Sequence, residues 1–277
     1  MSNASIPFSV LMCVYGKDNA QHFQTAVNSI LHQTAQPSEV VLVVDGPVPQ
    51  ELDQVICHYA ENPIFHIVRL ATNQGHGIAR RTGLAACSQE LVAIMDADDI
   101  CAPDRFEKQL AIFADNPNVS IVGGNITEFV ETPENIVGKR VVFTTDNEIK
   151  QDMKKRCPMN LVTVMFRKKL VEQAGGFIDW FCEEDYYLWL RMAQADMHFA
   201  NLSDILVNVR VGKEMYQRRG GWKYFASEAK LQNWMLQHKM IGLGTYIINV
   251  VKRLIVQVLL PNRLRSWVFQ KFARKQV

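Results

Sequence analysis

Apolar and polar positions in the first third of the chain alternate between two periods. Strand-like apolar runs lie at residues 8–14, 40–44 and 65–70. Between the first two runs, apolar residues recur at the spacing of one helix face: Phe23, Val27, Ile30 and Leu31. A strand, helix, strand, helix order is typical of a parallel sheet, so the pattern predicts an α/β fold.

The next apolar run, residues 91–95, has no polar alternation, as expected for a central parallel strand covered on both faces. It is followed by three carboxylates, Asp96, Asp98 and Asp99. Clustered like charges repel, and burying them is costly unless a positive charge lies among them. The cluster therefore predicts a bound cation. The alternative, that acids here only cap the helix that starts near Pro103, is credible for Asp99 or Asp104.

Other polar groups follow the neighbouring strand-like runs. Tyr15 ends the first run, Asp45 ends the second, and the segment "NQGHGIARR" brings two glycines, Arg80 and Arg81 after the third. Open parallel sheets bind ligands beyond the carboxyl ends of their strands. Oxygen-only ligands suit Mg²⁺ or Mn²⁺, so these strand ends predict a nucleotide pocket with a metal.

In the second half, longer strand-like runs at residues 121–130, 137–144 and 161–167 precede a helix through "EEDYYLWLRMA". This helix begins with Glu183, Glu184 and Asp185. Acids at a helix start interact favourably with the helix dipole, which accounts for one or two of them. The functional alternative is that one carboxylate acts as a general base for an acceptor hydroxyl.

Composition excludes several classes of protein. With 48% hydrophobic and 21% charged residues, the chain is ordinary globular material. Its six cysteines are scattered without a C-x-x-C pair, so neither a zinc site nor a disulfide framework is expected, and a reducing cytosol fits best. We also expect neither a signal peptide nor a membrane span, because the chain has no basic leader and no long apolar stretch.

The C-terminal tail is basic and amphipathic. No acid follows Glu228, whereas nine basic residues do, leaving 21 basic residues against 28 acidic ones. An apolar stripe at helical spacing comprises Ile247, Val250, Val251, Leu254, Ile255, Val258 and Leu259, and polar residues of the other face include Asn249, Lys252, Arg253 and Gln257. A second apolar set comprises Leu264, Trp267, Val268 and Phe272.

Basic amphipathic helices of this kind suit an anionic membrane surface. The alternatives are a helix packed on the body of the protein and an interface between two copies in a homodimer. Nucleic acid is disfavoured as a partner, because the apolar stripe is continuous.

Six segments occur in the order and spacing of family-2 glycosyltransferases of GT-A fold: "FSVLMCVYGKDNAQHFQTAVNSILHQT", "VVLVVDGP", "NQGHGIARRTGLAAC", "VAIMDADDICAPDRFEKQ", "NLVTVMFRKKLVEQAGGF" and "EEDYYLWLRMA". The chain resembles the bacterial capsule and exopolysaccharide branch of that family over about residues 8–211. The resemblance implies a Rossmann-like nucleotide-binding half with a mostly parallel central sheet, followed by a C-terminal helical tail. The expected catalytic domain spans residues 1–214, divided near residue 118 into donor and acceptor halves, and the tail spans residues 215–277.

The resemblance also implies roles for individual residues. Tyr15 would stack on the nucleobase, Asp45 would hydrogen-bond the base, and Arg80 would lie near the nucleotide. Asp96 and Asp98 would form the metal and ribose motif, with Asp98 on the metal, and Asp185 would be the catalytic base. In one departure, Leu161 stands where relatives often have a histidine, which puts an acceptor-side role at this position in doubt.

These expectations describe an inverting, Mn²⁺- or Mg²⁺-dependent enzyme. It would move a sugar from a nucleotide-sugar donor, expected to be a UDP-sugar, to a hydroxyl of a saccharide or lipid-linked acceptor in bacterial surface polysaccharide synthesis. It would work in the cytoplasm, peripherally on the inner face of the plasma membrane.

Two other classes fit less well. A sugar nucleotidyltransferase should have a glycine-rich phosphate loop after the first strand, where this chain has "YGKDNAQ". A metal-dependent nucleotide-sugar-binding module, or a degenerate partner subunit, should have lost the base, and Asp185 is present.

Overall fold

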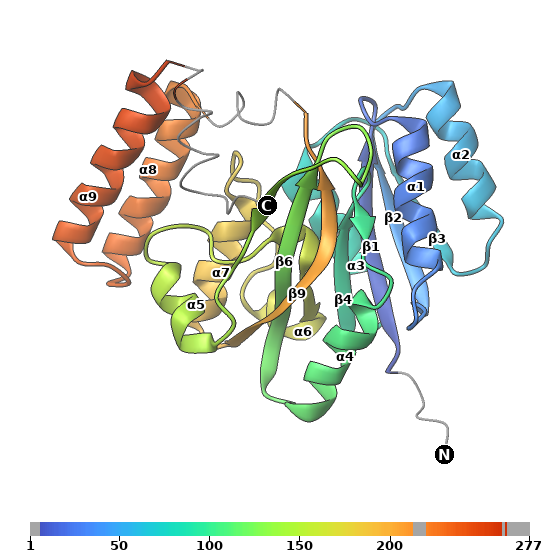
Figure 1. Cartoon of the computed structure of the whole chain (residues 1–277), viewed down its shortest axis with the longest axis horizontal. Helices are drawn as coiled ribbons and strands as arrows, with labels where there is room; N and C mark the ends of the chain where they lie inside the picture. Colours follow the sequence, from blue (N-terminus) through green and yellow to red (C-terminus); the bar gives the residue numbers. More distant parts are fainter. Residues whose placement is uncertain (1–5, 213–219, 262–263, 265–277) are drawn as a thin grey trace.

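The computed structural model describes residues 6–212, 220–261 and 264, which form a mixed sheet flanked by helices (Figure 1). Two expectations for the tail lie outside these residues. They are its opening near residue 215 and most of the second amphipathic set, namely Trp267, Val268 and Phe272.

The strands of the described residues form one sheet in the order β3-β2-β1-β4-β8-β6-β9-β5, with β7 beside β6. Their bounds are β1 (Phe8–Tyr15), β2 (Glu39–Asp45), β3 (Phe65–Leu70), β4 (Leu91–Asp96), β5 (Ile100–Cys101), β6 (Val119–Phe129), β7 (Ile136–Arg140), β8 (Met165–Arg167) and β9 (His198–Arg210). The four strands β3, β2, β1 and β4 are parallel, as predicted. Their register sets Tyr15 beside Asp45, and Cys13 beside Asp96.

Two predicted strands are shorter than the apolar runs that indicated them. The run at residues 161–167 begins with a 3₁₀ turn, Leu161–Thr163, and only β8 pairs in the sheet. The run at residues 137–144 belongs to β7, which ends at Arg140. Apolar character alone does not separate a strand from a buried turn, which explains both differences.

Helices cover both faces of the sheet. On one face lie α1 (Ala20–Leu31), α2 (Gln50–Ala60) and α4 (Arg105–Asp115), and on the other lie α3 (His76–Ala86), α5 (Asp146–Asp152), α6 (Lys168–Gln173) and α7 (Glu184–Gln194). Val10 and Met12 pack on the first face, whereas Leu11 packs on the second. Burial on both faces explains why β1 lacks polar alternation.

Two further helices, α8 (Trp222–Gln237) and α9 (Leu243–Leu254), form a hairpin outside the second helical layer (Figure 1). Residues Ile255–Leu259 continue α9 as a π-helical turn. In the part of the chain that the structure describes, every helix falls short of the length and apolarity that crossing a bilayer requires.

The carboxyl end of β4 is anchored by a buried cation. Arg105, at the start of α4, is fully buried, and its Nη2 donates to the Ile94 carbonyl at 2.8 Å. Its Nε donates to Gln109 Oε1 at 3.1 Å. These bonds satisfy the guanidinium and fix the strand just before its carboxylate cluster.

The sheet runs without a break through both halves of the expected catalytic domain. The short strand β8 pairs antiparallel with β4 on one side and with β6 on the other. Beyond it, β6 pairs in parallel with the long strand β9, for which the sequence pattern provided no prediction. The strand β8, from the second half of the catalytic domain, therefore covers the edge of β4, the last strand of the parallel group in the first half.

Candidate functional site

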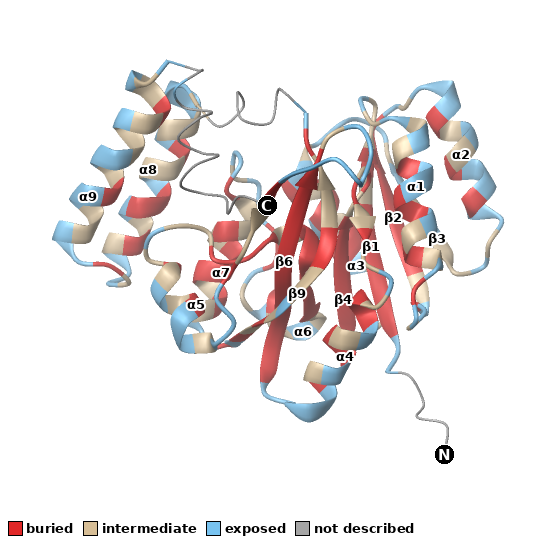
Figure 2. Cartoon of the chain, in the orientation of Figure 1, coloured by how far each residue is buried: buried red, intermediate tan, exposed pale blue. Residues whose placement is uncertain are grey.

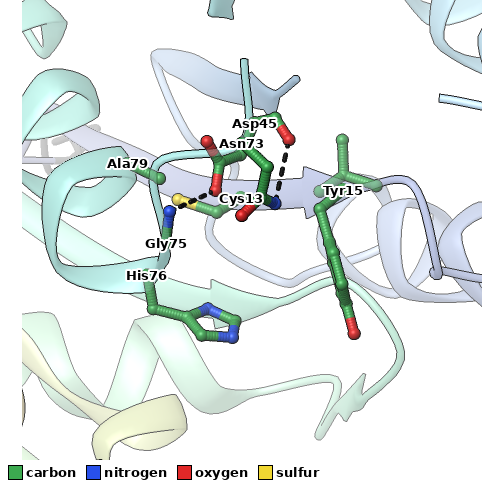
Figure 3. Close-up of a pocket in the computed structure, with 8 residues that line it drawn as sticks. Cys13, Tyr15, Asp45, Asn73, Gly75, His76 and Ala79 are labelled. Atoms are coloured by element: carbon green, nitrogen blue, oxygen red, sulfur yellow. Dashed lines mark hydrogen bonds between the residues drawn. The ribbon is translucent and has the colours of Figure 1, made fainter. Parts of the chain in front are cut away.

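A small pocket opens at the carboxyl ends of β1 and β2 (Figure 3). It has a volume of about 100 Å³ and is lined by Cys13, Val14, Tyr15, Asp45, Asn73, Gly75, His76 and Ala79. The Tyr15 and His76 rings line it with centroids 6.1 Å apart and planes at 66° (Figure 3). The structure thus brings Tyr15 and Asp45 together, and it adds His76, for which the sequence predicted no role.

Asp45 shapes this pocket through backbone contacts. Its two carboxylate oxygens accept hydrogen bonds from the backbone N–H groups of Gln74, at 2.7 Å, and Gly75, at 2.9 Å. The Asn73 amide donates to its carbonyl (Figure 3). Gly46, with φ at 85°, lets the Asn73 backbone approach closely, because a Cβ at Gly46 would lie 2.5 Å from the Asn73 nitrogen. Asp45 therefore ties β2 to the loop that begins α3.

Arg80 joins two parts of the site that are distant in sequence. It extends from α3 and is 5% exposed. Its Nη1 donates to Glu184 Oε1 at 2.8 Å, and its Nη2 lies 3.3 Å from Asp96 Oδ1. Burial disfavours the charged guanidinium, but attraction to Asp96 and Glu184 outweighs this and raises the pKa of Arg80. The predicted site residue thus connects the end of β4 with the start of α7.

The three carboxylates after β4 differ in environment. The Asp96 side chain is 42% exposed, Asp98 is half-buried, and Asp99 is buried. Asp99 accepts a hydrogen bond from the Arg210 backbone at 2.8 Å, and Arg210 Nε donates to the Asp98 carbonyl at 3.2 Å. Burial, and then repulsion from Asp98 and Asp96, raises the pKa of Asp99 well above its usual range.

Asp18 is a fourth acid near this cluster, and sequence reasoning missed it. Its carboxylate accepts a hydrogen bond from the Tyr15 backbone at 2.9 Å, which closes the turn after β1. Burial raises the pKa of Asp18 to about 6, with further contributions from Asp98 and Asp96. The only signal in the sequence is an acid three residues after the strand end.

These acids fit a divalent cation by their chemistry. Burial, with added repulsion from Asp98 and Asp96, raises the pKa values of Asp18 and Asp99, and a cation would relieve that repulsion. Within residues 6–212, 220–261 and 264, no three His, Cys, Asp or Glu side chains form a group that could hold a metal by themselves. Mg²⁺ is typically held by one or two carboxylates together with substrate phosphates and water, so this arrangement suits an ion that binds with its substrate.

The three acids at the start of α7 have separate environments. Glu183 is 4% exposed, and burial, followed by repulsion from Glu228 of α8, raises its pKa well above the usual range. Glu184 is bound to Arg80. Asp185 is half-buried and, unlike Glu184, makes no ion pair with Arg80.

Asp185 has the electrostatic character of a base. Its Oδ1 accepts from the Tyr186 backbone at 2.7 Å, and its Oδ2 lies 3.7 Å from the Cys157 thiol, which donates to it. Burial, and then the negative charge of Glu184, raises the pKa of Asp185 to about 6. The carboxylate is therefore mostly deprotonated at neutral pH, yet more basic than an ordinary aspartate.

Leu161 lies half-buried in the 3₁₀ turn and packs against the core of the second sheet face. Its side chain offers no acid–base group, so the polar contribution that a histidine would make is absent at this position.

Comparison with known proteins identifies relatives along the whole chain. The model of the family described as "Glycosyl transferase family 2" matches residues 9–173, more than half of the chain. The amylovoran biosynthesis glycosyltransferase AmsE of Erwinia amylovora is 36% identical, over 95% of this chain and 98% of its own. The UDP-Gal:alpha-D-GlcNAc-diphosphoundecaprenol beta-1,3-galactosyltransferase of Escherichia coli is 34% identical, over 99% of each chain.

Solved structures share the fold. S. aureus TarS 1–349 in complex with UDP-GlcNAc matches 90% of this chain and 72% of its own, with a TM-score of 0.66 at 16% identity. The mannosyltransferase PcManGT from Pyrobaculum calidifontis, in complex with GDP-Man and Mn²⁺, matches 93% of this chain and 71% of its own, with a TM-score of 0.58 at 18% identity. These similarities confirm the predicted GT-A fold.

We expect Arg80→Met to lower the free energy of unfolding by about 3 kcal/mol, because it leaves Glu184 and Asp96 without their buried counter-ion. Urea unfolding measures the loss. The exposed neighbour gives a matched control, since Arg81→Met should change stability by less than about 0.5 kcal/mol. Adding Glu184→Gln should recover part of the loss in the double variant. Equal effects of the two arginine substitutions would contradict the buried-pair interpretation.

Proposed function

The chain belongs to glycosyltransferase family 2 and is a glycosyltransferase, and we propose that it transfers a sugar from a UDP-sugar to a hydroxyl of a saccharide or lipid-linked acceptor, with inversion. One observation carries the assignment of its centre. Arg80 joins Asp96, at the donor-side strand ends, to Glu184, which immediately precedes Asp185. The groups to which we assign donor binding and proton acceptance thereby belong to one connected cluster.

On the donor side, we assign nucleotide binding to the pocket of Tyr15 and Asp45. The Tyr15 ring would stack on the base, since aromatic faces accept nucleobases readily. Asp45, held by two backbone N–H groups, would accept a hydrogen bond from the base. Asp96 would bind the ribose, and Arg80 would maintain the position of Asp96. The UDP-GlcNAc complex of the similarly folded TarS supports a nucleotide-sugar donor.

We also propose metal dependence, with Asp98 holding a Mn²⁺ or Mg²⁺ ion next to Asp96. When bound, such an ion would neutralise the negative charge on the diphosphate leaving group. The oxygen-only donor set and the mutual repulsion among the acids support this assignment. The Mn²⁺ complex of PcManGT, an enzyme of the same fold, agrees with it.

On the acceptor side, Asp185 would accept the proton of the attacking hydroxyl. Its pKa of about 6 increases its proton affinity and still leaves it mostly deprotonated at neutral pH. Tyr186 and Cys157 each donate to one of its oxygens and so orient it. Displacement of the nucleotide by the activated hydroxyl forms the new glycosidic bond directly, which inverts the anomeric carbon.

We further propose that the enzyme works peripherally at the inner face of a bacterial plasma membrane. The support is indirect: a relative 34% identical to the chain is named for a diphosphoundecaprenol acceptor, which is a lipid. An acceptor of that class would reside in a bilayer and would require the catalytic site to approach it.

Nucleotide binding tests the metal assignment. We expect UDP to bind in the presence of Mn²⁺, and a chelator or Asp98→Asn to weaken the affinity at least about tenfold, or ~1.4 kcal/mol. Titration calorimetry measures it. Asp104→Asn is the control, because Asp104 lies in the same segment but pairs with Lys108. If neither chelator nor Asp98→Asn changes the affinity for UDP, the proposed metal dependence is wrong.

Asp185→Asn should reduce transfer by about 10²- to 10⁴-fold, the usual contribution of a positioned proton acceptor. UDP affinity and thermal stability should stay near those of the unmodified enzyme. A nucleotide-release assay measures turnover. Near-normal turnover would reassign the role to Glu184 or Glu183.

The pH dependence provides an independent test. Because the base form of Asp185 is required, kcat should rise with pH up to about 6 and level off above it. Glu184→Gln removes the neighbouring negative charge that helps to raise the pKa of Asp185, so the acidic limb should move to lower pH. If the acidic limb of the kcat–pH profile stays at the same pH in this variant, a group other than Asp185 controls it.

A further inference from the structure

Helix α9 packs against the protein with its polar side. Asn249 and Gln257 are 6% and 4% exposed, and the Arg253 side chain between them is 12% exposed. These three residues follow at intervals of four along the helical run and form what we call the polar seam. Amphipathic helices of globular proteins usually bury their apolar stripe instead.

The first contact of the seam is made by Asn249. Its Nδ2 donates to Gln232 Oε1 of α8 at 2.8 Å and to the Lys154 carbonyl at 2.9 Å. One side chain thus links α9 to the other helix of the hairpin and to the segment that follows α5.

The next two turns repeat this pattern. Arg253 pairs with Glu228 of α8, with Nε and Oε2 3.0 Å apart, and its Nη2 donates to the Lys155 carbonyl at 3.0 Å. The Gln257 side-chain amide also donates to Glu228, and the Gln257 backbone carbonyl accepts from the Gly221 N–H at 2.9 Å. The turns at Asn249, Arg253 and Gln257 are therefore each held by polar bonds, which set the orientation of the helix about its own axis.

This rotation turns the apolar stripe outward. Six large apolar side chains of α9 and its π-helical extension are exposed: Leu243 (63%), Ile247 (50%), Ile248 (54%), Val251 (47%), Ile255 (45%) and Leu259 (65%). Figure 2 shows α9 at the edge of the molecule, with much of its surface exposed. A contiguous exposed apolar surface of this kind is typical of an interaction site.

The charge around this surface indicates what covers it. Lys239 and Lys252 are exposed, and no acid follows Glu228 in the sequence, whereas nine basic residues do. Trp222 follows Gly221, which is bonded to Gln257, and it is 67% exposed. An apolar stripe with flanking cations and an exposed tryptophan matches an interfacial helix on anionic lipid. Lys239 and Lys252 would be repelled by the same side chains of a second copy, whereas anionic lipid attracts them.

We propose that the outward face of α9 is a docking surface for an anionic lipid bilayer, and that the polar seam presents this face by fixing the helix with its apolar stripe away from the protein. The proposal deepens the proposed function, because it identifies the surface by which the enzyme would approach a lipid-linked acceptor. Lipid binding by this surface does not require turnover, so the two can fail separately.

The test is co-sedimentation of the full chain with vesicles of phosphatidylcholine alone or mixed with an equal part of phosphatidylglycerol, at low and high salt. The unmodified protein should pellet with the phosphatidylglycerol vesicles, and high salt should weaken binding without abolishing it, because apolar insertion resists salt. Ile247→Asp with Val251→Asp should reduce the bound-to-free ratio at least about tenfold.

A matched control replaces the same residue types on another surface. Ile136→Asp with Val137→Asp alters exposed positions of β7, 38% and 52% exposed, with the same change in charge, and should leave vesicle binding unchanged. UDP titration calorimetry on both variants should give unchanged affinity, which shows that each is folded and separates this test from that of the catalytic assignment.

Three outcomes would overturn the proposal. One is pelleting that the α9 variant does not reduce, and another is pelleting that is equal with and without phosphatidylglycerol. The third is a concentration-dependent dimer in sedimentation that the α9 variant disrupts, without vesicle binding. That result would assign the surface to a second copy of the chain.

Discussion

The geometry of the site depends on one buried cation. Arg80 reaches from α3 to the end of β4 and to the start of α7, two elements that almost ninety residues of sequence separate. Its guanidinium is planar and always charged, so it can bind two carboxylates in a defined orientation where an ammonium group could not. Without it, the acids of both elements would face each other across a space of low polarity. A single side chain thus links the end of β4 to the start of α7.

The sequence predicted the first four strands well, because each is a short apolar run followed by a polar turn, and β1, β2 and β4 are buried on both faces. It did not predict β9. That strand mixes buried and exposed positions irregularly, and it gains its partner, β6, from a distant part of the chain with several register shifts. Pairing between distant segments overrides local pattern in such strands.

The same limit applies to the site. Tyr15, Asp45 and Asp96 could be placed because the ends of parallel strands meet at one edge. The contacts of Asp18 and Arg210 depend on how a turn closes and on where β9 ends, and no spacing encodes either. In α9 the stripe was evident from the sequence, but its outward direction was not, since Glu228 and the backbone carbonyls that orient the helix are tertiary partners.

The position of β8 has a consequence for synthesis of the chain on the ribosome. As the amino-terminal half emerges, β1 to β4 can pair in the order β3-β2-β1-β4, but the free edge of β4 is completed only by Met165–Arg167. An apolar strand with an open edge is a template for pairing with other chains. A nascent chain paused before residue 165 would therefore present that edge to its neighbours, and a chaperone would protect it from wrong pairing.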